Sequence, residues 1–116
     1  MLTRYLFGLP FVTVRCDSGP IEAVLDTGFN GELLLPKQVI REFDLQRVGS
    51  ALYTMADGAS AEAEIFSLEL EWFNERRIVH VVASTADLPL MGMELLHNVK
   101  TTLCPVKNLL KVELVE

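Results

Sequence analysis

Asp26, Thr27 and Gly28 are the strongest candidates for chemistry in this chain of 116 residues. They directly follow an apolar segment, residues 21–25, whose composition is typical of a buried strand. The Asp26 carboxyl is therefore expected at a strand end, where removing a charge from water is costly and usually requires a partner or a chemical role. A structural interpretation is equally open at this point, because Asp, Thr and Gly all favour turns.

The other residues able to bind metal or act as nucleophiles form no known arrangement. The soft metal ligands are His80, His97, Cys16 and Cys104, and no pair of them has zinc-site spacing. Both cysteines lie in apolar, strand-like segments, which favours inert thiols over a Cys-His nucleophile. No serine stands in a Gly-x-Ser-x-Gly frame, and there is no Walker-type phosphate loop. We therefore expect neither a metal nor a cofactor.

The composition narrows the class of protein. Half of the residues are hydrophobic and 22% are charged, which fits one globular domain over residues 1–116. The net charge of −6, with no basic cluster longer than Arg76-Arg77, argues against nucleic-acid binding. No apolar run reaches the roughly 20 residues that span a bilayer, and no cleavage site follows the apolar segment after Arg4. We expect a cytoplasmic protein with reduced thiols and no membrane contact.

The elements that position Asp26 are predicted to be mostly strands. Segments rich in β-branched and apolar residues predict strands at residues 11–16, 21–25, 33–35, 52–56, 60–72, 78–83, 101–104 and 109–115. Tyr5 to Val14 is interpreted as an N-terminal strand. Short helices are expected at residues 37–43, after Pro36, and at residues 93–98. The predicted fold is an all-β, barrel-like domain.

Two patterns refine this prediction. Asp57-Gly58 indicates a hairpin, because both residue types tolerate positive φ. In the strand that follows, apolar residues alternate with polar ones, which is typical of a sheet with one solvated face. The apolar set is Phe66, Leu68, Leu70 and Trp72, and the polar set includes Glu62, Glu64, Glu69 and Glu71.

The order of these features resembles that of the retropepsin-like aspartic proteases, over residues 11–115. Three segments carry the resemblance: Val24-Leu25-Asp26-Thr27-Gly28, the hairpin Met55-Ala56-Asp57-Gly58, and Leu90-Met91-Gly92-Met93-Glu94-Leu95-Leu96. The run from Asp26 to Gly31, with Phe29 after the Asp-Thr-Gly, is most similar to the small bacterial branch. The resemblance implies a closed acid-protease barrel lobe with one or two short helices.

The resemblance also implies a homodimer in which each chain supplies one lobe and Asp26 faces its own copy. Two carboxylates that share one proton can activate a water and protonate a peptide carbonyl. Thr27 would tie the two loops together, and Gly28 and Gly92 would permit close backbone approach. Residues of the hairpin would close over a bound peptide: Met55, Ala56, Asp57 and Gly58. The expected function is an aspartic endopeptidase that cleaves peptides or proteins without a cofactor.

Two alternatives remain open from the sequence. Phe29 stands where family members usually carry a small residue, and Asn30 where retroviral enzymes often have a second Asp. A bulky Phe29 beside the carboxylates favours a catalytically silent module of the same dimeric fold that binds peptides or protein partners. The other alternative is an unrelated small barrel in which the tripeptide is only a turn.

Overall fold

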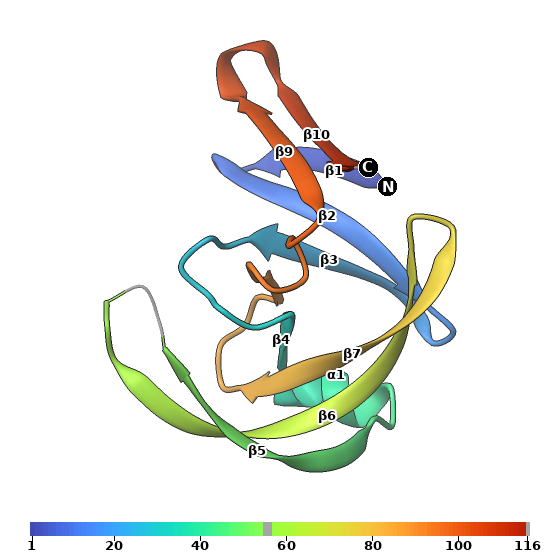
Figure 1. The fold of residues 1–116 in the computed structure, drawn as a ribbon, viewed down its shortest axis with the longest axis vertical. Coiled ribbons are helices and arrows are strands. Elements are labelled where there is room, and N and C mark those ends of the chain that lie inside the picture. The colour runs from blue at the N-terminus through green and yellow to red at the C-terminus, as the bar shows by residue number, and fades with distance from the viewer. Residues whose placement is uncertain (55–56, 116) are drawn as a thin grey trace.

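The computed structural model describes residues 1–54 and 57–115, and Figure 1 shows the arrangement of their elements. These residues contain ten strands, one α-helix and one 3-10 helix. In chain order they are β1 (Leu2–Leu6), β2 (Leu9–Cys16), β3 (Gly19–Leu25), β4 (Leu33–Pro36), α1 (Lys37–Glu42), β5 (Gln46–Thr54), β6 (Ser60–Trp72), β7 (Glu75–Ser84), β8 (Leu90–Met91), β9 (Val99–Cys104), η1 (Pro105–Lys107) and β10 (Leu109–Leu114). The prediction of an all-β fold with one or two short helices is confirmed.

Eight of the strands form one sheet in the order β1-β2-β3-β8-β4-β7-β6-β5. An additional pairing, between Arg15 in β2 and Glu71 in β6, folds the sheet back onto itself. The sheet therefore curls into a barrel-like lobe, and the long β5–β6 hairpin curves along one side of it (Figure 1).

The remaining two strands, β9 and β10, pair with each other and form a separate small sheet. This sheet lies against β1, near both chain ends (Figure 1). Two side chains of β1 attach it, since Thr3 Oγ1 donates a hydrogen bond to the Leu110 carbonyl at 2.7 Å and Tyr5 Oη donates to that of Leu109 at 2.8 Å.

The short strand β8 occupies the centre of the large sheet, between β3 and β4. It runs parallel to β3, with Leu25 opposite Met91, and antiparallel to β4, with Leu33 opposite Met91. Because β3 and β4 are separated by β8, the chain that joins them must leave the sheet and return. That connection is residues 26–32, which contain the Asp-Thr-Gly tripeptide.

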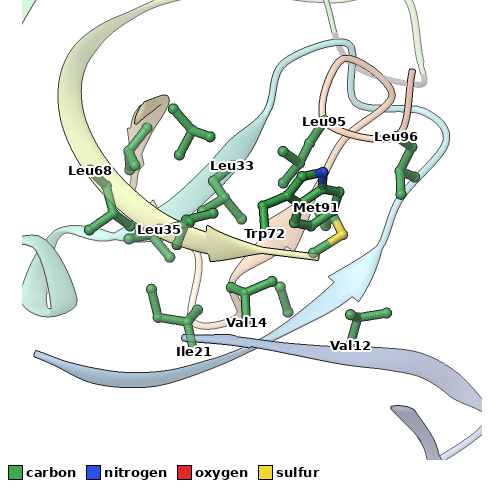
Figure 2. Packing of buried hydrophobic residues seen from close by; sticks show 14 of the residues in the cluster. Val12, Val14, Ile21, Leu33, Leu35, Leu68, Trp72, Met91, Leu95 and Leu96 are labelled. Atoms are coloured by element: carbon green, nitrogen blue, oxygen red, sulfur yellow. The ribbon is translucent and has the colours of Figure 1, made fainter. Parts of the chain in front are cut away.

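The main hydrophobic core lies on one face of the curled sheet (Figure 2). Leu33 and Leu35 of β4, with Leu68 of β6, pack there against strands β2 and β3. Trp72 and Met91 lie at the centre of the same cluster (Figure 2). Burial of these side chains supplies the main driving force that holds the strands together.

A second, smaller hydrophobic cluster lies apart from this core. It consists of Phe29, Leu34, Ile65 and Val82, with Ala51, Ala63 and Leu90 packed against it. Since neighbouring residues of a strand point to opposite faces, the buried pairs Leu33/Leu34 and Val81/Val82 show that both faces of this part of the sheet are covered. We call this group the Phe29 cluster.

Several predicted bounds differ in the structure, chiefly those of two strands and one helix. The segment from Tyr5 to Val14 is not one strand, because Phe7 and Gly8 both have positive φ and form the two-residue turn of a hairpin between β1 and β2. β5 begins at Gln46, well before residue 52, and pairs with β6 through an irregularity between Arg47 and Gly49. The expected helix after Pro36 is present as α1, although α1 ends at Glu42.

The predicted helix at residues 93–98 is wrong, because these residues form turns. One helix-type hydrogen bond is made, from Leu96 N–H to the Gly92 carbonyl at 3.3 Å. Val99 already belongs to β9, so the segment is too short to offset the cost of starting a helix. None of the helices within residues 1–54 and 57–115 is long and apolar enough to cross a membrane.

The core assignment predicts the effect of shortening two leucines in neighbouring strands. Leu70 in β6 has no exposed surface, whereas Leu52 in β5 is 72% exposed. We expect Leu70→Ala to lower the free energy of unfolding by about 2–5 kcal/mol, because it removes buried methyl groups and leaves a cavity. The matched Leu52→Ala should change it by less than about 0.5 kcal/mol. Urea unfolding measures both values. Equal losses of unfolding free energy would contradict the assignment of Leu70 to the core.

Candidate active site

The backbone of Asp26 continues the ladder between β3 and β8. Its N–H donates to the Met91 carbonyl at 2.9 Å, one residue past the last β3 pairing. The chain then turns, since the N–H of Phe29 donates to the Asp26 carbonyl at 3.2 Å. Asp26 is therefore fixed by a strand on one side and by a tight turn on the other, as expected for a strand-end residue.

The Asp26 carboxylate is oriented by its own loop. Oδ1 accepts a hydrogen bond from the Gly28 N–H at 2.9 Å, the geometry of an Asx turn. Across residues 1–54 and 57–115 no Lys, Arg or His forms an ion pair with Asp26, and no buried side-chain oxygen lacks a partner. Asp26 Oδ2 accepts no hydrogen bond and forms no ion pair with the described residues, and a buried oxygen would have a partner. Oδ2 therefore reaches solvent, where it can meet a water or a second carboxyl group. Thr27 beside it is exposed.

Gly92 crosses this loop at very short range. A Cβ atom on Gly92 would overlap the Gly31 carbonyl oxygen and come within 2.6 Å of the Phe29 ring and 2.8 Å of the Phe29 carbonyl oxygen. The backbone is hydrogen-bonded at the same place, because Gly92 N–H donates to the Glu32 carbonyl and Met93 N–H to the Phe29 carbonyl, each at 2.9 Å. Only glycine fits between these groups.

Glu32 anchors the far end of the loop to β7, a role that the sequence did not reveal. Its Oε2 accepts from Arg77 Nη2 at 2.8 Å, and its Oε1 accepts from the His80 backbone N–H at 2.9 Å. The Glu32 side chain is 11% exposed, so this ion pair is better shielded from solvent than the other pairs. No local signal marks the contact, because its partners lie 45 and 48 residues away.

Farther back along β3, Glu22 forms a second anchoring ion pair. Arg4 Nε and Nη2 donate to the two Glu22 oxygens, both at 2.7 Å, and this hydrogen bonding lowers the pKa of the Glu22 carboxyl. The pair connects β1 to β3 across β2, which lies between them. It therefore helps to fix the strand that leads to Asp26.

The similarity of this chain to known proteins lies in its fold. No family model and no curated protein matches the chain. Among solved structures, the EIAV protease in complex with the inhibitor HBY-793 matches with a TM-score of 0.65 at 14% identity, over 83% of this chain and 92% of the viral one. A retropepsin-like aspartic protease from Rickettsia conorii matches with a TM-score of 0.66 at 19% identity, over 94% of this chain and 85% of its own.

The chain has the retropepsin-like fold.

A third match concerns part of a larger molecule. The foamy viral protease-reverse transcriptase in complex with an RNA/DNA hybrid matches 85% of this chain but only 14% of its own, with a TM-score of 0.56 at 14% identity. At these identities the likeness describes the shape of the retropepsin-like lobe. Activity must be argued from the residues of this chain.

Phe29 occupies a different position from the one that its sequence context suggested. Its side chain is fully buried in the Phe29 cluster, between strands of the retropepsin-like lobe. A solvent-filled groove of about 430 Å³ lies beside the cluster, and Phe29 contributes to its lining. Phe29 therefore forms part of the floor of a groove and does not stand free beside the Asp26 carboxylate.

The predicted substrate-binding hairpin is described in part. Met55 and Ala56 lie outside the described residues. Asp57 is exposed, and its Oδ1 accepts from the Ala59 N–H at 2.9 Å. Gly58 has φ +83°, as expected for a turn residue. The strands that carry the hairpin reach the Asp26 loop, because Ala51 and Ala63 pack against the Phe29 cluster.

The residues singled out as possible metal ligands are not brought together. Within the described part of the chain, no group of three or more His, Cys, Asp and Glu side chains could hold a metal ion. Cys16 and Cys104 are both free thiols, and the Cys16 Sγ donates to the Gly19 carbonyl at 3.3 Å.

The crossing at Gly92 predicts a large difference between two glycine substitutions. We expect Gly92→Ala to lower the free energy of unfolding by about 3 kcal/mol, because the new methyl group meets backbone atoms that cannot move aside cheaply. Gly49→Ala in β5 is the matched control, since no atom lies within 4 Å of the added Cβ there. It should be neutral or stabilise by about 0.5 kcal/mol through the unfolded chain. Urea unfolding compares them, and equal effects would contradict the close crossing.

Proposed function

We propose that this protein is an aspartic endopeptidase whose active site forms when two copies bring Asp26 and its equivalent together. The observation that carries the proposal is the Asp26 carboxylate, fixed through Oδ1 by Gly28 and open at Oδ2, in a retropepsin-like lobe. A single carboxylate cannot serve at once as base and as proton donor, so the site of one lobe is incomplete.

In the proposed mechanism the two carboxyl groups share one proton. Like charges about 3 Å apart cannot both remain ionised, so one Asp26 is a carboxylate and the other a carboxylic acid. The carboxylate takes a proton from a water as that water attacks the peptide carbonyl carbon. The acid donates its proton to the carbonyl oxygen, and the tetrahedral intermediate then breaks down to a carboxylic acid and an amine.

The proposed dimer assigns a role to each residue around Asp26. The exposed Thr27 would hydrogen-bond across a two-fold axis, which is the commonest symmetry of homodimers. Gly28 holds Oδ1 and leaves room for the other copy, and Gly92 keeps the loop seated on β8. The hairpin with Met55, Ala56, Asp57 and Gly58 would cover a bound peptide and exclude water.

The proposed substrates are peptides or proteins, and the proposed chemistry uses neither metal nor cofactor. The two free thiols fit the reducing cytoplasm. A catalytically silent peptide-binding module is the second candidate, because the groove beside the Phe29 cluster would hold a peptide whether or not Asp26 reacts. The sequence-based argument for that module, a bulky Phe29 beside the carboxylates, loses its force because Phe29 is buried in the Phe29 cluster and not beside Asp26.

Replacing the Asp26 carboxyl predicts complete loss of cleavage. We expect the protein to cut a diverse peptide mixture at discrete sites between pH 4 and 7, and Asp26→Asn to remove every cut, because an amide cannot act as the base. Asp44→Asn is the matched control: Asp44 is exposed, has φ +52°, and Asn tolerates that conformation well. Mass spectrometry of the products measures both. Cuts that persist in Asp26→Asn would refute the proposal, as would a folded dimer that cuts nothing.

The proposed dimer also predicts how mixed chains behave. Adding an equal amount of Asp26→Asn chains to the protein should reduce the cleavage rate to about half, because random pairing places half of the active chains in one-carboxylate dimers. A monomeric enzyme would keep its full rate. Sedimentation at the assay concentration provides the control, since exchange requires that dimers form and dissociate.

A further inference from the structure

The groove beside the Phe29 cluster is the most distinctive concave feature near the Asp26 loop. It lies between the start of β6 and the end of β7, and its volume is about 430 Å³. More of its lining is apolar than polar. The apolar part includes Leu34, Ala61, Ala63 and Val82, and the polar part is Lys37, Glu62, Glu64, Ser84 and Thr85. We call it the hairpin groove. A lining that is more apolar than polar favours an apolar group as its occupant.

Among the side chains that the structure describes, Phe29 is the one aromatic group in the lining of the hairpin groove. It belongs to the loop that carries Asp26 and follows that residue by three positions. Its side chain has no exposed surface, so the ring lies beneath the part of the groove that solvent reaches. The ring packs in one cluster with side chains from three strands, Leu34 of β4, Ile65 of β6 and Val82 of β7.

We propose that Phe29 sets the depth of the hairpin groove and thereby selects short aliphatic over aromatic side chains close to the cleaved bond. This inference rests on the proposed endopeptidase function. Phe29 already fills the space that an aromatic ring of the substrate would need. The alanines at positions 61 and 63 leave lateral room for a branched aliphatic side chain such as that of Val or Leu.

The position of Phe29 in the chain explains why this selection acts near the reacting bond. The Phe29 N–H donates to the Asp26 carbonyl, so the ring and the carboxylate belong to one tight turn. An extended peptide directs alternate side chains to the same face, so a residue close to the cleaved bond would point towards the ring. Phe29 is thus a specificity-determining residue and takes no part in proton transfer.

The test compares substrate preference in Phe29→Ala and in a control from the same cluster. Starting from a mapped cleavage site, peptides carry Val, Leu or Phe at each of the two positions before and after the cut bond. At one of these positions the wild-type protein should favour Val or Leu over Phe by about tenfold or more in kcat/KM. In Phe29→Ala that ratio should fall by about tenfold or invert, because the groove becomes deep enough for a ring.

Ile65→Ala is the matched control, because Ile65 packs in the Phe29 cluster but does not line the groove. Both substitutions remove buried carbon, so a general loss of packing would lower all three rates together in either variant. A ratio that stays within twofold of wild type in Phe29→Ala would overturn the inference. So would a wild-type preference for Phe at all four positions. Phe29→Leu, which keeps more of the packing, is used in the same assay where Phe29→Ala fails to fold.

A second measurement detects ligand binding in the groove without catalysis. The endopeptidase proposal and the proposed role of Phe29 can therefore fail separately. Toluene is added to the Asp26→Asn protein with and without Phe29→Ala, and the methyl NMR signals of Leu34 and Val82 are followed. We expect toluene to shift these signals only when Phe29 is absent. Equal shifts in both proteins, or none in either, would overturn the role of Phe29. Absence of cleavage by the wild-type protein would refute the endopeptidase proposal alone.

Discussion

The close contact between Gly92 and the loop ahead of β4 is the constraint on which the rest of the lobe depends. β8 contains only two residues, yet it pairs with both β3 and β4. The amides after it extend this pairing, as Met93 N–H and Glu94 N–H donate to the Phe29 and Gly31 carbonyls. These bonds satisfy buried backbone groups of the Asp26 loop that water does not reach. The position of the carboxylate therefore follows from the crossing more than from its own side-chain contacts.

Strand β4, which follows the crossed loop, separates two regions with different roles. On one face of β4, Leu33 and Leu35 enter the main core, which holds the strands together. On the other face Leu34 enters the Phe29 cluster, which borders the hairpin groove. Because the residues alternate along one strand, the core cannot shift without moving the groove. This rigid coupling suits the proposed site, in which a carboxylate and a substrate side chain would be held in fixed relation.

The sequence predicted what depends on neighbouring residues and missed what depends on distant ones. The bounds of β6, the position of Asp26 after a strand and the helix after Pro36 follow from alternation and turn chemistry within a few residues. The Glu32–Arg77 pair and the burial of Phe29 depend on contacts that only the closed sheet creates. One signal of the second cluster was present. In the sequence of β6 the apolar residues lie at odd positions up to Ile65 and at even positions from Phe66 on, so the strand must pack on both faces.

The Asp26 loop divides its side chains in a way that supports the proposed dimer. Phe29 points into the lobe and is fully buried, while Thr27 is exposed and Asp26 keeps one oxygen open to solvent. The contacts that fix the loop are made within the chain, to β8, through Glu32 and in the Phe29 cluster. A second copy could therefore approach the outer side without displacing any of these contacts. In that arrangement the fold supplies the rigidity of the site within one chain, and the pairing of two chains supplies the shared proton that the chemistry requires.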